Sequence, residues 1–491
     1  MTPIYTVAGI RRLESLAAPA PGAPTLMERA GLAAAEHARA LCGERARDIL
    51  VVAGPGNNGG DAFEVAIHLK RGFHRVHVVF AGERSKLPPD AARALAKWEA
   101  AGGDLLSAIP AGVRFSLAVD GLFGIGLARP LGAAHAGLVR ALNALGAPVL
   151  ALDIPSGVNG DTGAAMGEAV RATRTVTFIA RKPGLLTLDG PDHRGEIVVE
   201  TLGVDAAALL APEGLLAGPD SLERALRPRP MNFHKGRAGS VGILGGAAGM
   251  SGAAFLAGRA ALKCGAGRTY VGLLAPIALD PVQPELMLRA AKDLFAKSLL
   301  TVLAAGPGLG RSEAAKKALD AAIGAKLPLV LDADGLNLVA ASAALAKKVA
   351  AREAPTVMTP HPAEAGRLLG RETHEVQYDR VAAAKAIAKR YSALVALKGN
   401  GTVVAAPDGH WWINPTGNPG MASAGMGDVL TGIVAALLAQ GASPGDAAVA
   451  GVYLHGAAAD RLVASGVGPV GLTAGEVIDA ARALLNSKKP G

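Results

Sequence analysis

The sequence predicts two doubly wound α/β domains joined by a proline-rich hinge. Short apolar runs that fit buried strands alternate with helical patterns along the chain. Most of these runs end in glycine or in a polar residue, as strands do where open α/β sheets bind ligands. Residues 210–229 contain several prolines and no recognisable strand pattern. We therefore place the domains at residues 1–215 and 222–491.

The composition is consistent with a cytoplasmic protein. The 491 residues suffice for about two or three domains, and 50% are hydrophobic but only 3% aromatic, which predicts aliphatic cores. Cys42 and Cys264 lie far apart and match no metal-binding spacing, so both are expected to be reduced thiols. The N-terminus is charged where a signal peptide is apolar, and no apolar run is long enough to span a membrane.

The net charge of +9 suits small anionic substrates or a solvated surface. No basic stripe with interleaved aromatic residues appears, and basic residues stand next to one another only in pairs, such as Lys488-Lys489 at the C-terminus. These features argue against a nucleic-acid partner. We expect small-molecule substrates and a homo-oligomer, with no nucleic-acid or membrane partner.

The first half contains five predicted strands and two clear helical patterns. The strands are expected at residues 49–53, 76–80, 117–120, 149–153 and 175–178, and the helices at 25–42 and 62–70. Glycine turns follow three of the strands, and the polar residues at their ends are Asn58, Asp120, Asp153 and Ser156. Because the carboxyl ends of parallel strands meet at one sheet edge, we expect these side chains to converge.

The second half repeats the strand-and-helix alternation with other motifs. Strands are expected at 240–244, 301–305, 329–332, 356–358 and 394–397, and helices at 251–263 and after Gly425-Met426-Gly427-Asp428. Free amides at such a helix start attract phosphate. A carboxylate beside a phosphate would be repelled, so we interpret Asp428 as a base that takes a proton from an attacking hydroxyl. The alternative is that Asp428 only caps the helix.

Three motifs stand out in the first half: Gly54-x-Gly56-Asn57-Asn58-Gly59-Gly60-Asp61, Gly124-Ile125-Gly126-Leu127-x-Arg129-Pro130 and Asp153-Ile154-Pro155-Ser156-Gly157. With them the first half resembles the NAD(P)H-hydrate epimerase family over residues 5–210. The resemblance implies a Rossmann-like sheet, a catalytic Asp153, and K⁺ bound near Asn58, Asp120 and Ser156. The ligand atoms that these side chains supply are oxygens, which suit K⁺. The residues implied to bind the hydrated nicotinamide nucleotide are Asn57, Asn58, Gly59, Gly60, Asp61, Gly124, Ile125, Gly126, Leu127, Ala128, Arg129, Pro130 and Asp153. Taken singly, Asn58 could be a turn residue, and Asp120 or Asp153 a helix cap.

Two positions depart from the epimerase pattern. Ala62 stands where the family usually has glycine, and alanine there costs on the order of 1 kcal/mol if the position needs a positive φ. Ile125 replaces a common threonine and removes a possible hydrogen bond to ligand. Both departures concern how tightly the site binds.

The second half resembles the ADP- or ATP-dependent NAD(P)H-hydrate dehydratases, of ribokinase-like fold, over residues 225–485. The motifs are Gly306-x-Gly308-x-Gly310, Asp332-Ala333-Asp334-Gly335-Leu336-Asn337, Thr359-Pro360-His361, Lys398-Gly399-x-x-Thr402 and Gly425-Met426-Gly427-Asp428. The resemblance implies hydrate binding by Ala253, Gly308, His361 and Asp428, and nucleotide binding by Lys398, Gly399, Asn400, Gly401, Thr402 and Gly427. The alternative for His361 is a loop histidine whose hydrogen bonds are satisfied locally. Ala363 departs from the family's Thr-Pro-His-x-Gly-Glu pattern.

Together these resemblances imply repair of hydrated NADH and NADPH. The first domain would interconvert the R and S hydrates. The second would phosphorylate the ring hydroxyl of the S-hydrate from ADP or ATP and eliminate phosphate, releasing AMP or ADP, with Mg²⁺ bridging the nucleotide phosphates. Two alternatives remain open: a small-metabolite kinase of the thiazole or pyridoxal type, because Gly-x-Gly-Asp is shared across the fold, and a non-catalytic nucleotide sensor, against which Asp428 argues.

Overall fold

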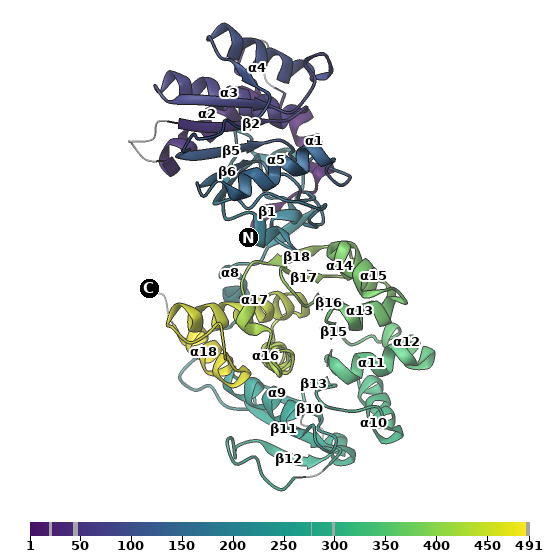
Figure 1. The fold of residues 1–491 in the computed structure, drawn as a ribbon. Coiled ribbons are helices and arrows are strands. Elements are labelled where there is room, and N and C mark those ends of the chain that lie inside the picture. Colours follow the sequence, from purple (N-terminus) through teal and green to yellow (C-terminus); the bar gives the residue numbers. More distant parts are fainter. Residues whose placement is uncertain (19–21, 43–47, 276, 297–299, 488–491) are drawn as a thin grey trace. The chain divides into compact units, whose positions relative to one another are not determined.

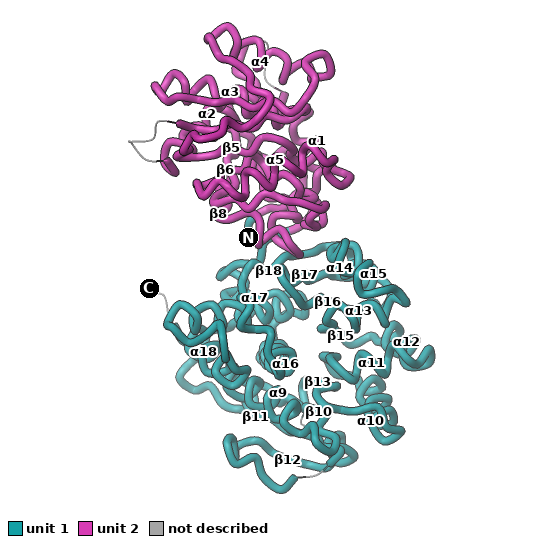
Figure 2. Tube along the Cα trace, in the orientation of Figure 1, with its two compact units in different colours: residues 1–2, 215–491 teal, residues 3–214 magenta. Residues whose placement is uncertain are grey.

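The chain forms two compact units, residues 3–214 and residues 1–2 with 215–491 (Figure 2). The structure is a computed structural model that describes residues 1–18, 22–42, 48–275, 277–296 and 300–487. The C-terminal pair Lys488-Lys489 lies outside the described residues. Within them, no helix is long and apolar enough to cross a membrane.

The N-terminal unit is built on a parallel sheet of seven strands in the order β4-β3-β2-β5-β6-β7-β8. Its central strands β2, β5 and β6 lie side by side (Figure 1). The strands are β2 (Asp48–Ala53), β3 (Arg75–Phe80), β4 (Leu105–Leu106), β5 (Leu117–Gly121), β6 (Val149–Leu152), β7 (Arg174–Phe178) and β8 (Glu196–Glu200). The helices are α1 (Val7–Leu16), α2 (Leu26–Cys42), α3 (Asn57–Arg71), α4 (Pro89–Ala100), α5 (Ala133–Ala144), α6 (Gly190–His193) and α7 (Ala206–Leu209). The predicted doubly wound parallel sheet is therefore present.

Both faces of this sheet are buried, which explains the unbroken apolar strands. Along β2, Ile49 and Val51 pack into one hydrophobic cluster, and Leu50 and Val52 pack into the cluster on the other face. The chain runs outward from β2 through β3 to β4 and then returns to β5 beside β2. This reversal creates a crevice at the carboxyl ends of β2 and β5, where such sheets bind ligands.

The C-terminal unit has a mixed sheet of eleven strands, in the order β1-β9-β18-β17-β16-β15-β14-β13-β10-β11-β12. The strands are β1 (Thr2–Ile4), β9 (Gly214–Leu216), β10 (Ser240–Gly245), β11 (Arg268–Leu273), β12 (Met287–Ala290), β13 (Val302–Ala305), β14 (Leu329–Leu331), β15 (Thr356–Met358), β16 (Leu394–Leu397), β17 (Thr402–Ala405) and β18 (Trp411–Asn414). Strands β10 to β16 are parallel, whereas β16, β17 and β18 pair in antiparallel fashion.

Helix α16 (Met426–Ala439) lies at the centre of the C-terminal unit. The other helices are α8 (Asp220–Ala225), α9 (Ser251–Lys263), α10 (Glu313–Gly324), α11 (Ala333–Ala341), α12 (Ala343–Ala350), α13 (Pro362–Leu369), α14 (Thr373–Tyr378), α15 (Arg380–Tyr391), α17 (Pro444–Ala464) and α18 (Ala474–Asn486). From Val429 to Ala439 every residue of α16 is buried, and the helix contacts α9, α17 and strands β10, β13 and β14. A helix that is apolar all round belongs in a core, so its polar start is fixed at the strand ends.

The expectation that residues 210–229 contain no strand is wrong. Gly214–Leu216 forms β9, which pairs in parallel with β18, and the C-terminal unit therefore begins at Leu215 rather than at 222. The residues at the very start of the chain also join that unit, because β1 lies beside β9 at the sheet edge. Three residues among prolines give too short an apolar pattern to be recognised.

Helix α3 begins earlier than predicted, because Asn57–Gly60 form its first turn instead of a preceding loop. The glycines there serve close packing. A Cβ on Gly59 would lie 2.0 Å from the carbonyl oxygen of Gly54, and a Cβ on Gly54 would lie 1.7 Å from that of Leu122. The loops after β2 and β5 therefore meet backbone to backbone.

Candidate active sites

A cavity of about 340 Å³ opens at the carboxyl ends of β2 and β5. Several residues predicted to bind the hydrate line it: Asn57, Asn58, Asp61, Gly124, Ile125, Gly126, Leu127 and Asp153. Others predicted with them lie outside the lining: Gly59, Gly60, Ala128, Arg129 and Pro130. The wall also includes residues of α1, Ile10, Arg11 and Glu14, which the sequence analysis did not identify.

Asp153 is held in an unusual conformation at the edge of this cavity. Its φ of 64° is in the left-handed region, which costs a non-glycine residue energy and is commonest at functional sites. The carboxylate accepts a hydrogen bond from the amide of Phe178 at 3.3 Å and forms an ion pair with Lys182. This environment fixes the direction of the side chain, and it shows that Asp153 is not simply a helix cap.

Lys182 is a buried cation that sequence reasoning missed. Its side chain is 0% exposed. Besides Asp153, the ammonium donates to Oγ1 of Thr177 at 2.9 Å and to the carbonyl oxygen of Phe178 at 2.7 Å. All three of its protons therefore have acceptors. In the sequence it stands in Arg181-Lys182-Pro183, which is typical of a solvated loop, so no local signal distinguishes it.

Three carboxyl groups, those of Glu14, Asp61 and Asp153, line the same cavity. Burial raises the pKa of Asp61 well above its usual range, and the neighbouring Asp153 and Glu14 raise it further. Burial, followed by the charge of Asp153, also raises the pKa of Glu14. Burial and mutual repulsion therefore favour the protonated form of Glu14 and Asp61, which is the direction that general acid chemistry requires.

Asp120 and Ser156 lie together directly beneath the loop after β5. The amide and Oγ of Ser156 donate to the Asp120 carboxylate at 2.8 and 2.6 Å, and the amide of Leu122 donates to it at 3.3 Å. Burial raises the pKa of Asp120 to about 6, against the effect of the hydrogen bonds from Ser156. Asn58 is 8% exposed, and neither its Oδ1 nor its Nδ2 has a hydrogen-bond partner among the described residues.

The two departures from the epimerase pattern have different consequences. Ala62 lies inside α3 with ordinary helical geometry and is fully buried, so the cost of a positive φ does not arise. Ile125 lines the cavity and presents an apolar wall there.

In the C-terminal unit, Asp428 lies in the first turn of α16. The N-cap is Gly425, with φ 86°, and the helix has no side-chain cap, so the interpretation of Asp428 as an N-cap is wrong. The pKa of Asp428 is raised to about 7, by burial first and by the charge of Asp332 second, against the opposing effect of Lys398. A carboxyl with a pKa near neutrality is well matched to general-base catalysis.

The turn after β16 has glycines that need special backbone geometry. Gly399 and Gly401 have φ values of 136° and 65°, which favour glycine. Lys398 at its start does not extend along the turn, because its Nζ is 2.6 Å from Oδ1 of Asp332. That carboxylate and Glu364 raise the pKa of Lys398 even though burial lowers it. Across the pair lies Gly427, where a Cβ would come within 3.1 Å of the Lys398 Nζ.

His361 is the N-cap of α13. Its Nδ1 accepts from the amides of Ala363 and Glu364 at 3.1 and 3.4 Å, while Glu364 accepts from the His361 amide at 2.8 Å, which completes a capping box. Burial and the charge of Lys398 lower the pKa of His361. Both effects favour the neutral ring, and because Nδ1 accepts two amide hydrogen bonds, the neutral ring carries its proton on Nε2. For Nδ1, the alternative of a histidine whose hydrogen bonds are satisfied locally is therefore correct.

Ala253 and Gly308 lie side by side where the loops after β10 and β13 meet. Gly308 has φ 56°, and a Cβ there would lie 2.3 Å from the carbonyl oxygen of Met250 and 3.2 Å from the Cβ of Ala253. The amide of Ala247 also donates to the Gly308 carbonyl at 2.7 Å. Small residues at this junction leave backbone accessible to a ligand.

Comparison with known proteins matches both halves of the chain. Residues 241–480 match the family model described as NAD(P)H-hydrate dehydratase, and residues 23–184 match the model described as YjeF-related protein N-terminus. A bifunctional NAD(P)H-hydrate repair enzyme of Coxiella burnetii is 41% identical, covering 99% of this chain and 100% of that protein. One of Escherichia coli is 40% identical, covering 94% of this chain and 89% of that protein.

Among solved structures, the ADP/ATP-dependent NAD(P)H-hydrate dehydratase of Bacillus subtilis, co-crystallised with ATP/Mg²⁺, is 32% identical with a TM-score of 0.49. The similar region covers 55% of this chain and 97% of the Bacillus subtilis chain. The assignment rests on the full-length relatives, whose similarity spans both units. The chain therefore belongs to the family of bifunctional NAD(P)H-hydrate repair enzymes.

Proposed function

We propose that the C-terminal site restores NAD(P)H from its S-hydrate, with Asp428 as the base. The observation that carries this proposal is the Asp428 carboxyl group, which lies at a helix start, caps nothing and has a pKa raised to about 7. The carboxylate takes the proton of the ring hydroxyl as its oxygen attacks the terminal phosphorus of ADP or ATP. The nucleotide leaves as AMP or ADP, and the new phosphate ester then loses phosphate together with a ring proton.

The nucleotide binds on two elements, the turn of residues 398–402 and the start of α16. Amides at a helix start and in glycine turns stabilise negative charge on the phosphoryl group that is transferred. Mg²⁺ would be held mainly by the nucleotide phosphates, where it neutralises charge, because no group of three His, Cys, Asp or Glu side chains among the described residues forms a metal site. Ala253, Gly308 and His361 contact the hydrate, with the neutral His361 donating from Nε2.

The N-terminal cavity interconverts the R and S hydrates. Asp153 transfers the proton that epimerisation of the hydrate requires. The raised pKa values of Asp61 and Glu14 support proton transfer within the same cavity. Its apolar wall, which includes Ile125, suits the nicotinamide ring. Of the residues carried over from the epimerase family, those that line the cavity form the hydrate site.

Potassium would bind beside this cavity. Asn58 supports the proposal because its buried Oδ1 has no donor among the described residues, and Asp120 retains lone pairs beyond its three hydrogen bonds. Asp120→Ala should weaken epimerisation and leave dehydration intact, and epimerisation should be faster in K⁺ than in Li⁺. Equal rates in both salts would remove the K⁺ assignment.

The proposal is tested by giving the full chain hydrated NADH with ADP or ATP in turn. The expected result is a return of dihydronicotinamide absorbance together with one released phosphate for each molecule restored. A metabolite kinase would instead accumulate a phosphorylated product without absorbance, and a sensor would bind nucleotide without consuming it. Either outcome would contradict the proposed function.

A further inference from the structure

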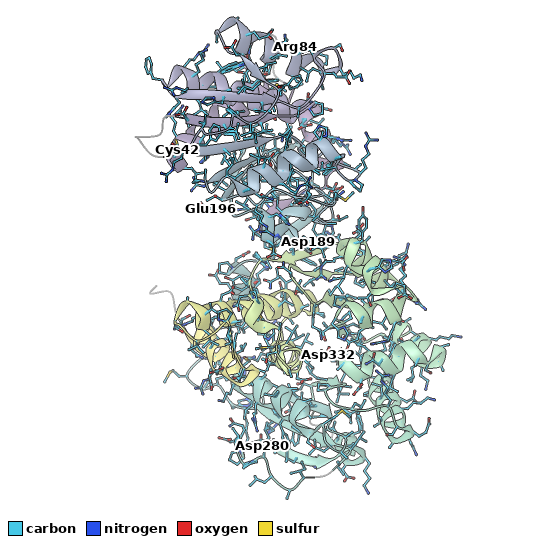
Figure 3. The ribbon with its side chains drawn as sticks, in the orientation of Figure 1. Cys42, Arg84, Asp189, Glu196, Asp280 and Asp332 are labelled. Atoms are coloured by element: carbon cyan, nitrogen blue, oxygen red, sulfur yellow. The ribbon has the colours of Figure 1, made fainter. Side chains whose placement is uncertain are left out.

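Asp332 occupies an N-cap position but makes no capping hydrogen bond. It ends β14 and precedes α11, with the extended backbone of an N-cap residue, yet its side chain does not bond the amides of α11. An aspartate at this position normally does. Its side chain is 1% exposed and is labelled in Figure 3 within the C-terminal unit. The carboxylate is committed to other partners.

The two oxygens of Asp332 bind different elements of the site. Oδ1 accepts from Nζ of Lys398 at 2.6 Å, and Oδ2 accepts from Oγ1 of Thr431 at 2.8 Å. Lys398 begins the turn proposed to hold the nucleotide. Thr431 is fully buried on α16, three residues after Asp428, so the two share one face of the helix. A Cβ on Gly427 would lie 3.4 Å from Oδ2, which places Asp332 against the backbone that precedes Asp428.

We propose that Asp332 is a positioning residue that joins the nucleotide turn to the helix carrying the base, with one oxygen on Lys398 and the other on Thr431. This inference rests on the proposed function of the C-terminal site. It adds a role for a buried carboxylate whose two oxygens both accept hydrogen bonds from other side chains. Asp332 acts through Lys398 and Thr431, and it fixes the distance between the phosphoryl donor and the proton acceptor.

The same arrangement controls the charge around Asp428. The charged groups that face Asp428 are Asp332, Asp334, Glu364 and Lys398. The three carboxylates disfavour ionisation of Asp428, and the lysine favours it. Since a base acts in its ionised form, activity is lost as pH falls through the pKa of Asp428, about 7. Removing the Asp332 charge should lower that pKa, and removing the Lys398 charge should raise it.

The test compares three full-length variants by the pH dependence of kcat/KM for dehydration, which reports the free enzyme. Asp332→Asn should move the acid limb to lower pH, raise the nucleotide KM and reduce the plateau by roughly 10²-fold, the usual effect of a small misplacement. Lys398→Met should move the limb to higher pH. Thr431→Val is the matched control, because it removes one bond of Asp332 without a change in charge, so its rate should fall with the limb unmoved.

Shifts of the acid limb in opposite directions in Asp332→Asn and Lys398→Met would support the inference. An acid limb at the wild-type pH in both variants would overturn it, even if their melting temperatures fell. If Asp332→Asn does not fold, the upward shift in Lys398→Met decides the question. If the wild-type chain restores no absorbance, the proposed function fails separately. The inference is then tested by ¹³C NMR titration of the Asp428 carboxyl group. Its titration midpoint should lie at lower pH in Asp332→Asn than in the wild type, and an unchanged midpoint would overturn the inference.

Discussion

At the scale of single residues, the proposed chemistry depends on carboxyl groups whose ionisation the fold disfavours. Asp428 is the clearest case, because its pKa is raised to about 7 by burial first and by Asp332 second. An aspartate in an unfolded chain has a pKa near 3.9, so the folded state binds the proton more tightly than the unfolded state. Between these two pH values the stability of the C-terminal unit therefore falls as pH rises, by this group's contribution.

Asp428→Asn separates activity from stability. Asparagine keeps the shape but cannot take a proton, so dehydration should fall by roughly 10²–10⁴-fold. The melting temperature at pH 8 should stay level or rise, because the variant removes an ionised group that the fold disfavours. At pH 4 the melting temperatures should nearly coincide. Near-normal turnover, or a large loss of stability at pH 8, would contradict the assignment of Asp428.

The buried pair of Lys182 and Asp153 predicts a stability effect in the N-terminal unit. Lys182→Met would leave the Asp153 carboxylate without its cation, and breaking a buried pair in this way costs about 3–5 kcal/mol. The control Lys86→Met removes a lysine that is 70% exposed and should cost almost nothing. Denaturant unfolding of the two variants measures the difference, and equal stabilities would show that the Lys182 pair contributes little.

Candidate site residues could be singled out from the sequence where they stand in a recognisable motif, after a strand for Asp153 and Lys398 and after a glycine turn at a helix start for Asp428. Their partners could not. Lys182, Glu14 and Arg380 reach their sites through tertiary contacts that leave no local pattern. His361 shows a further limit, because Pro362 and Glu364 in the sequence already fit a capping box, and only the structure shows that Nδ1 is used for it.

At the scale of elements, a buried arginine holds the turn of residues 398–402, which we propose binds the nucleotide. Arg380 at the start of α15 is 1% exposed, and its Nη2 donates to the carbonyl oxygens of Leu397 and Lys398 at 3.1 and 3.2 Å. Burial lowers its pKa to about 10, so it stays charged at neutral pH. A Cβ on Gly399 would lie 2.9 Å from its Nη1, so the turn and the guanidinium fit closely.

Arg380→Lys should raise the nucleotide KM by roughly tenfold while changing kcat little. Lysine keeps the charge but lacks the planar fork that bonds both carbonyls, so the turn loses its fixed shape. Lys385→Met on the exposed face of the same helix is the control and should leave the KM unchanged. Steady-state kinetics with varied ADP measures this change. A changed hydrate KM with an unchanged ADP KM would show that the turn binds the hydrate and not the nucleotide.

The strands that sequence reasoning missed are mostly near the sheet edges, including β8, β11, β12, β17 and β18. The β17–β18 hairpin had a usable signal, because Pro407-Asp408-Gly409 separates two short apolar runs and is typical of a turn. Strand β9 had none, since three residues cannot establish a period. Central parallel strands were predictable because burial on both faces requires continuous apolar sequence.

At the scale of the whole molecule, each unit has its own sheet and its own hydrophobic clusters. In the N-terminal unit the candidate site lies at the carboxyl ends of β2 and β5, beside a reversal of strand order. In the C-terminal unit the candidate residues extend from the loops after β10 and β13, where the strand order reverses, to the carboxyl ends of β14, β15 and β16. The two-domain α/β organisation was predictable because it depends on repeated patterns. The predicted end of the first domain, residue 215, lies next to the division between Gly214 and Leu215. The second domain was placed to start at 222 because the pairing of β9 with β18 leaves no pattern in the sequence.

The central claim is that one chain carries two distinct activities at two separate sets of residues. The most direct measurement follows the initial rates at which separated R- and S-hydrates are consumed by the full-length wild type, Asp153→Asn and Asp428→Asn, with ADP or ATP present. We predict that the wild type consumes both epimers. Asp153→Asn should consume the S-hydrate at the wild-type rate but barely consume the R-hydrate. Asp428→Asn should restore NADH from neither epimer while still interconverting the R- and S-hydrates. An Asp153→Asn variant that consumes both epimers at the wild-type rates would contradict the account.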